Sequence, residues 1–95
     1  MTNSGRERKL RPGRVDLYEQ LLEVARRYFD RVEEESGDFR GGICRVRGEK
    51  YLVLNRQAKL ERKLSTVASA LSSLDLDQQY LLPAVREAID RYSEL

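Results

Sequence analysis

The chain of 95 residues contains no histidine and no tryptophan, and its single cysteine is Cys44. Histidine titrates near neutral pH, binds metals more often than any other side chain, and is the usual base behind serine and cysteine nucleophiles. Its absence argues against hydrolytic and metal-dependent active sites, so we expect no enzyme activity, no cofactor and no metal. With one cysteine, no disulfide can form within the chain.

Long apolar runs are also missing. No segment approaches the roughly 18 apolar residues that a membrane-spanning helix needs. The first residues, Met1-Thr2-Asn3-Ser4-Gly5, lack the apolar stretch of a signal peptide. We therefore expect a cytoplasmic protein of a reducing compartment, with no membrane partner and no evident small-molecule substrate.

The composition suits one small domain, since 40% of the residues are hydrophobic and 36% are charged. Residues 1–14 hold five basic residues and one acidic residue but few apolar ones. Such a segment cannot bury enough surface to offset the entropy of ordering, so it predicts a flexible basic leader. Residues 15–95 are expected to form a single α+β domain.

A first helix is predicted over residues 16–35. Apolar residues recur at steps of three and four, and Asp16 is well placed as the N-cap. The segment ends at Glu33-Glu34-Glu35, with Gly37 suited to the residue after the helix. Three glutamates at this end oppose the helix macrodipole, which costs a few tenths of a kcal/mol each.

Two β-rich runs, 43–47 and 50–54, predict a hairpin with Gly48-Glu49 as a type II′ turn. In this register Arg47 lies opposite Lys50 and Cys44 opposite Val53. One face is expected to pack on the helices, with Cys44 as a core residue, and it carries Cys44, Val46, Tyr51 and Val53. The other face mixes apolar and basic residues, namely Ile43, Arg45, Arg47, Lys50, Leu52 and Leu54. A third short strand is possible around residues 38–40.

Two further helices are predicted over residues 57–74 and 83–92, and Pro83 suits the first position of the second of these. The expected fold is α+β: a long N-terminal helix, a β-hairpin that can carry a third short strand, and two C-terminal helices packed on one face of the sheet.

The end of the hairpin at Asn55 and the helix that follows resemble the core of the ImmA/IrrE-type metallopeptidases over residues 40–75. In that family the helix carries Ala-His-Glu-Leu-Gly-His, where this chain has Ala68-Ser69-Ala70-Leu71-Ser72-Ser73. The resemblance implies a related scaffold without its zinc site. Ser69 and Ser73 would stand at the ligand positions, and Ala70 would replace the general base.

The chain also looks like short bacterial proteins that share a Gly-Gly-x-Cys-Arg strand, here residues 41–45, and a Leu-Pro segment followed by Arg-Glu, here residues 82–87. This resemblance implies no particular activity.

Charge is unevenly distributed along the chain. Residues 15–39 hold three basic and eight acidic residues, whereas residues 40–63 hold eight basic and two acidic ones. The basic centre could attract a polyanion. Its candidate phosphate contacts are Arg40, Arg45, Arg47, Lys50, Arg56, Lys59, Arg62 and Lys63.

Two binding functions follow from these patterns. The first is a non-catalytic interaction or regulatory module that binds a protein partner, or a second copy of itself, through the mixed face of the hairpin, because apolar residues rimmed by charge are typical of contact surfaces. Its candidate residues are Ile43, Arg45, Arg47, Lys50, Leu52 and Leu54. The alternative is a nucleic-acid-binding module that uses the basic hairpin and the start of the second helix. Against that alternative stands the expected inward direction of Tyr51, which leaves no aromatic strand residue exposed for base stacking.

Overall fold

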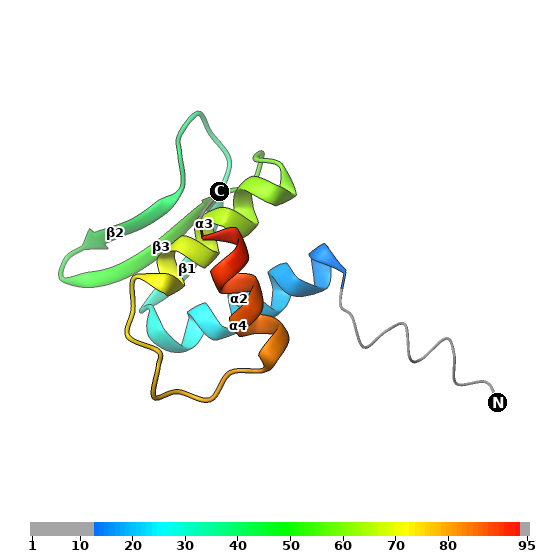
Figure 1. Ribbon diagram of the computed structural model, residues 1–95. Helices are drawn as coiled ribbons and strands as arrows, with labels where there is room; N and C mark the ends of the chain where they lie inside the picture. Colours follow the sequence, from blue (N-terminus) through cyan, green and yellow to red (C-terminus); the bar gives the residue numbers. More distant parts are fainter. Residues whose placement is uncertain (1–12, 94–95) are drawn as a thin grey trace.

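The computed structural model describes residues 13–93, so most of the expected basic leader, residues 1–14, lies outside the described residues. The elements are helix α2 (Arg14–Tyr28), strands β1 (Arg31–Glu35), β2 (Gly42–Val46) and β3 (Glu49–Asn55), and helices α3 (Leu60–Ser72) and α4 (Pro83–Tyr92) (Figure 1). The strands lie in the sequence between the first helix and the last two. The α+β prediction is confirmed.

The sheet is mixed and has the order β1-β3-β2. β1 runs parallel to the central strand, with Val32 beside Leu52, and β2 runs antiparallel to it, with Ile43 beside Leu52. Because β1 and β2 flank β3 on opposite sides, residues 36–41 must pass the carboxyl end of β3. We call residues 36–41 the crossing loop.

The core lies between one face of the sheet and the three helices: α2 and α3 pack on that face, and α4 packs on α2 and α3 (Figure 1). Leu52 and Leu54 of β3 are fully buried there. The helices contribute the other fully buried large side chains, which are Leu21, Leu64, Val67, Leu71 and Val85. Alternation along a strand sends Tyr51 and Val53 to the opposite face, where no element within residues 13–93 covers them.

The first helix is shorter than predicted, because residues 31–35 form β1 instead of its last turns. The helix ends at Tyr28, and Phe29 turns the chain into extended conformation with its ring buried. Ending here places Arg26 and Arg27 in the last turn, where basic side chains complement the macrodipole. The three glutamates that would oppose the macrodipole of the predicted helix lie in a strand instead. The sheet does have a third strand, but it is β1 and does not lie at residues 38–40 as expected.

The hairpin is confirmed, but its predicted register is wrong. The turn is Arg47-Gly48, with φ of 53° and 85°, as in a type I′ turn. Val46 therefore pairs with Glu49, and Cys44 pairs with Tyr51. The prediction placed Gly48 at the first central position of a type II′ turn. In the structure Gly48 is at the second central position of a type I′ turn, where glycine is also common.

The C-terminal helices match the prediction closely. α4 has the predicted bounds and begins at Pro83, while α3 is shorter than the predicted 57–74, since a turn occupies residues 55–58. In the described part of the chain, none of the helices combines the length and the apolar character that spanning a membrane requires.

Candidate functional site

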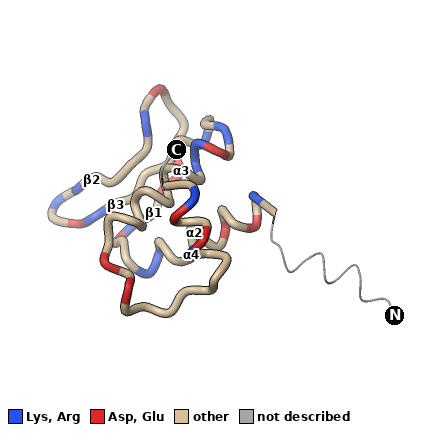
Figure 2. Tube along the Cα trace, viewed as in Figure 1, with Lys and Arg blue, Asp and Glu red and all other residues tan. Residues whose placement is uncertain are grey.

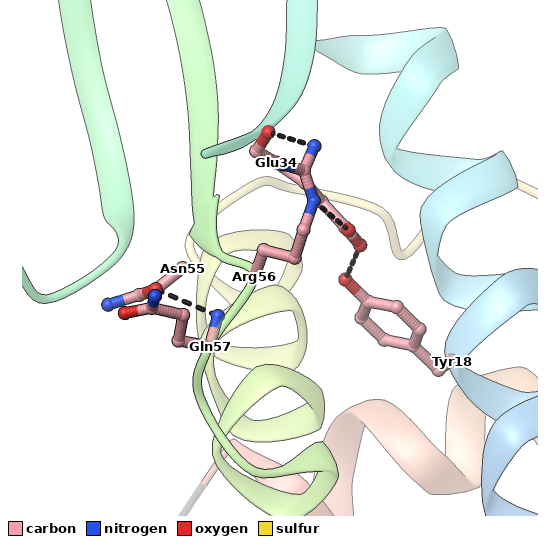
Figure 3. Close-up of polar contacts among 5 residues, drawn as sticks. All are labelled: Tyr18, Glu34, Asn55, Arg56 and Gln57. Carbon is pink, nitrogen blue, oxygen red and sulfur yellow. Dashed lines mark hydrogen bonds and ion pairs between the residues drawn. The ribbon is translucent and has the colours of Figure 1, made fainter. Parts of the chain in front are cut away.

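Asn55 holds the crossing loop against the end of β3. Its Nδ2 donates to the carbonyl oxygens of Gly37 (2.9 Å) and Phe39 (2.7 Å). Its Oδ1 accepts a hydrogen bond of 2.9 Å from the backbone N–H of Gln57 (Figure 3). One side chain thus fixes both the crossing loop and the turn that leads into α3.

A second group of polar contacts connects α2, β1 and the segment before α3. The Arg56 Nη2 donates to the backbone oxygen of Glu34 at 2.8 Å, and its Nε lies 3.9 Å from the Glu34 carboxylate (Figure 3). The Tyr18 hydroxyl donates to the same carboxylate. Burial, together with this carboxylate, raises the pKa of Tyr18 well above its usual value. A tyrosine hydroxyl is protonated at neutral pH in any case, and the raised pKa keeps it a donor to Glu34 at higher pH than usual.

A groove of about 1210 Å³ lies between the crossing loop, the start of β2 and the first turns of α3. Small residues let these elements approach one another. A Cβ added to Gly41 would lie 2.6 Å from the backbone oxygen of Val53, so glycine is required where the loop meets β3. Thr66 and Ser69 of α3 also line the groove, and their hydroxyls bond to the backbone oxygens of Arg62 and Ser93.

The lining of the groove is basic. It includes Arg40 from the crossing loop and Lys59, Arg62 and Lys63 at the start of α3. The lining carboxylate of Glu61 lies 2.5 Å from the guanidinium of Arg14. Within residues 13–93, the side chains of Arg40, Lys59 and Arg62 form no ion pair.

Most of the basic side chains of the groove lie at the amino terminus of α3, where positive charge is unfavourable. The amino terminus of α3 carries the positive end of the helix dipole, so Lys59, Arg62 and Lys63 are repelled by it. Lys59 is also the N-cap residue, and its side chain provides no capping hydrogen bond. A bound anion would reverse both costs, because it attracts the basic side chains and the helix terminus together.

Of the eight residues predicted to contact phosphate, four line the groove: Arg40, Lys59, Arg62 and Lys63. Arg45 and Arg47 are exposed on β2 and in its turn, outside the groove lining. Arg56 is bound to Glu34, and the Lys50 ammonium lies 5.5 Å from the centroid of the Phe29 ring. Lys63 lines the groove and also contacts α2, because its ammonium lies 5.2 Å from the centre of the Tyr18 ring.

The predicted interaction face does not lie open as expected. Leu52 and Leu54 are fully buried beneath the helices, whereas Ile43 is 40% exposed and lines the groove. The division of the hairpin into two faces was right, but the helices cover the face expected to be open. Cys44, expected in the core, is exposed on the uncovered face with Val46, Tyr51 and Val53.

The sequence interpretation missed Phe39, which is 37% exposed and lines the groove beside Arg40. The signal that could have revealed it is its position between Gly37 and Gly41, because glycines indicate a tight loop. An aromatic side chain on such a loop does not belong to the apolar face of a helix or strand.

The two serines that the metallopeptidase resemblance places at ligand positions make local contacts. Ser73 donates to the backbone oxygen of Ala70 at 2.6 Å, and Ser69 donates to that of Ser93 at 3.3 Å. Comparisons of the whole chain with protein-family models, with curated proteins and with solved structures found no match. The resemblance therefore stays a prediction.

Proposed function

We propose that this protein is a non-catalytic nucleic-acid-binding module, with the basic groove as its contact to the phosphate backbone. The observation that carries the proposal is the cluster of Arg40, Lys59 and Arg62 around one groove, without ion pairs among residues 13–93. Binding to phosphates would satisfy these charges and release counterions from the nucleic acid.

The distribution of the remaining charge supports the same contact. The acidic residues Glu33, Glu34 and Glu35 lie in β1, at the opposite edge of the sheet from β2 with Arg45 and Arg47. Figure 2 shows basic positions along β2, in its turn and at the start of α3. A polyanion that approaches the β2 side therefore meets positive charge and avoids the acidic strand.

The sequence of the N-terminal segment carries further positive charge. Residues 1–12 lie outside the described residues, but their sequence contains Arg6, Arg8, Lys9 and Arg11 against Glu7. The described chain starts close to the groove, since Arg14 contacts Glu61. Because the segment and the groove both carry positive charge, a polyanion would attract both.

Neutralising the groove is expected to weaken nucleic-acid binding about tenfold. The negative slope of log affinity against log salt should become shallower, by about 2 to 3. The variant is Arg40→Gln/Lys59→Gln/Arg62→Gln, measured by fluorescence anisotropy with labelled single-stranded and duplex oligonucleotides at several salt concentrations. The reason is the loss of three phosphate contacts.

The matched control is Arg26→Gln/Arg27→Gln/Arg91→Gln, which makes the same change in net charge at exposed positions that do not line the groove. It should retain most of the affinity. Equal losses in the two variants would refute a localised site, and no binding by the wild-type chain at low salt would refute the function.

Self-association is a second candidate function, favoured by the uncovered face of the sheet. Its centre is apolar, with Cys44, Val46, Tyr51 and Val53, and charges of both signs lie on the same face, with Arg31 against Glu33, Glu35 and Glu49. In a two-fold contact the arginine of each copy could meet glutamates of the other, which makes a second copy of this chain the expected occupant.

Val46→Glu is expected to abolish a concentration-dependent dimer that the wild-type chain forms, because it places a charge in the apolar centre. Sedimentation equilibrium over a wide concentration range measures this. Val15→Glu is the control, since Val15 is 62% exposed on α2. A wild-type chain that stays monomeric at every concentration would exclude this candidate.

A further inference from the structure

We infer that the groove selects single-stranded over duplex nucleic acid, with Phe39 stacking on a base while Arg40, Lys59 and Arg62 hold the flanking phosphates. This inference rests on the proposed function and adds the form of the ligand and the residue that recognises it.

Phe39 is placed where a base could reach it. Phe39 as a residue is 37% exposed and lines the groove next to Arg40. On the side of the loop the ring lies against Gly37, where an added Cβ would be 3.1 Å from Phe39 Cδ1. The backbone thus supports the ring and leaves part of its surface accessible.

The loop that carries this ring is fixed before any ligand binds. Asn55 holds the carbonyl groups on both sides of the segment, at Gly37 and at Phe39 itself. A ring that is already positioned loses little conformational freedom on binding, so more of the stacking energy appears as affinity.

The groove combines the two features that sequence-tolerant single-strand binders share, a basic path and an aromatic platform. Ile43, which is 40% exposed, adds apolar surface beside Phe39 in the same lining. In a duplex the faces of the bases are hidden within the stack, so the ring could contact base edges, sugar and phosphate but could not stack on a base.

Phe39→Ala should reduce the affinity for a labelled oligothymidylate about tenfold while leaving the salt dependence unchanged, because stacking is lost and the phosphate contacts remain. Binding to a duplex should change little. Circular dichroism of the variant verifies that it is folded.

Phe39→Trp gives a direct readout, since the chain contains no tryptophan. Oligothymidylate should quench this tryptophan, whereas a tryptophan at position 80, in Tyr80→Trp, should respond weakly, because Tyr80 is 79% exposed and does not line the groove. Tyr80→Trp should bind as tightly as the wild-type chain.

Three results would overturn the inference alone: equal affinity for duplex and single strand, an unchanged affinity of Phe39→Ala, or no quenching of the tryptophan at position 39. In each case the groove variant Arg40→Gln/Lys59→Gln/Arg62→Gln would still lose binding. If no nucleic acid binds at all, the proposed function fails together with this inference.

Discussion

Leu54→Ala is expected to lower the free energy of unfolding by about 3 kcal/mol, whereas Val53→Ala lowers it by about 1 kcal/mol. The two residues are neighbours on the central strand and face opposite sides of the sheet. Leu54 is fully buried beneath the helices, while Val53 is half-buried on the uncovered face. Truncation of Leu54 leaves a cavity in the core, but water can fill the space left by Val53.

Urea denaturation followed by circular dichroism measures both values, and the same slope in all variants would show that only stability has changed. Leu52→Ala extends the comparison, since Leu52 is also fully buried on the helix side. A larger loss for Val53→Ala than for Leu54→Ala would mean that the helices pack on the other face, as the sequence interpretation expected.

The choice between these faces could not be made from the sequence. Each face of the hairpin offers apolar residues from β3, Tyr51 and Val53 on one and Leu52 and Leu54 on the other. Alternation separates the two sets but does not say which one the helices cover. The decision depends on packing with α2 and α3, whose buried leucines are distant in sequence.

The strand β1 was missed for a related reason. Val32 continues the helical spacing that starts at Leu17, and three successive glutamates rarely form strands. What stabilises β1 is its parallel pairing with β3, whose residues lie about 20 positions further along the chain. Local propensity contains no information on such a partner, whereas α4, set by Pro83 and a clear apolar stripe, was predicted with its correct bounds.

The candidate site was predictable in its composition but not in its geometry. The excess of basic residues between positions 40 and 63 is visible in the sequence, and four of them line one groove. Which basic residues are engaged elsewhere depends on tertiary contacts, such as that between Arg56 and Glu34. The exposed ring of Phe39 depends on the path of the crossing loop, which follows from the unpredicted strand β1.

The geometry of the groove depends on Asn55, and Asn55→Ala is expected to lower the free energy of unfolding by about 2 kcal/mol. The alanine removes three hydrogen bonds, two from Nδ2 to the crossing loop and one that Oδ1 accepts from Gln57. Each such bond contributes roughly 1 kcal/mol net, and water can replace part of this at the exposed Phe39 carbonyl. Chemical denaturation measures the loss.

Asn55→Asp separates the two roles of this side chain. Its carboxylate can still accept from the Gln57 N–H but cannot donate to Gly37 and Phe39, and it places negative charge beside their carbonyl oxygens. We expect the aspartate to destabilise the protein at least as much as the alanine, with faster amide hydrogen exchange over residues 36–42. If the aspartate retains wild-type stability and protection, the turn at Gln57 is what Asn55 stabilises, and the position of Phe39 over the groove must have another cause.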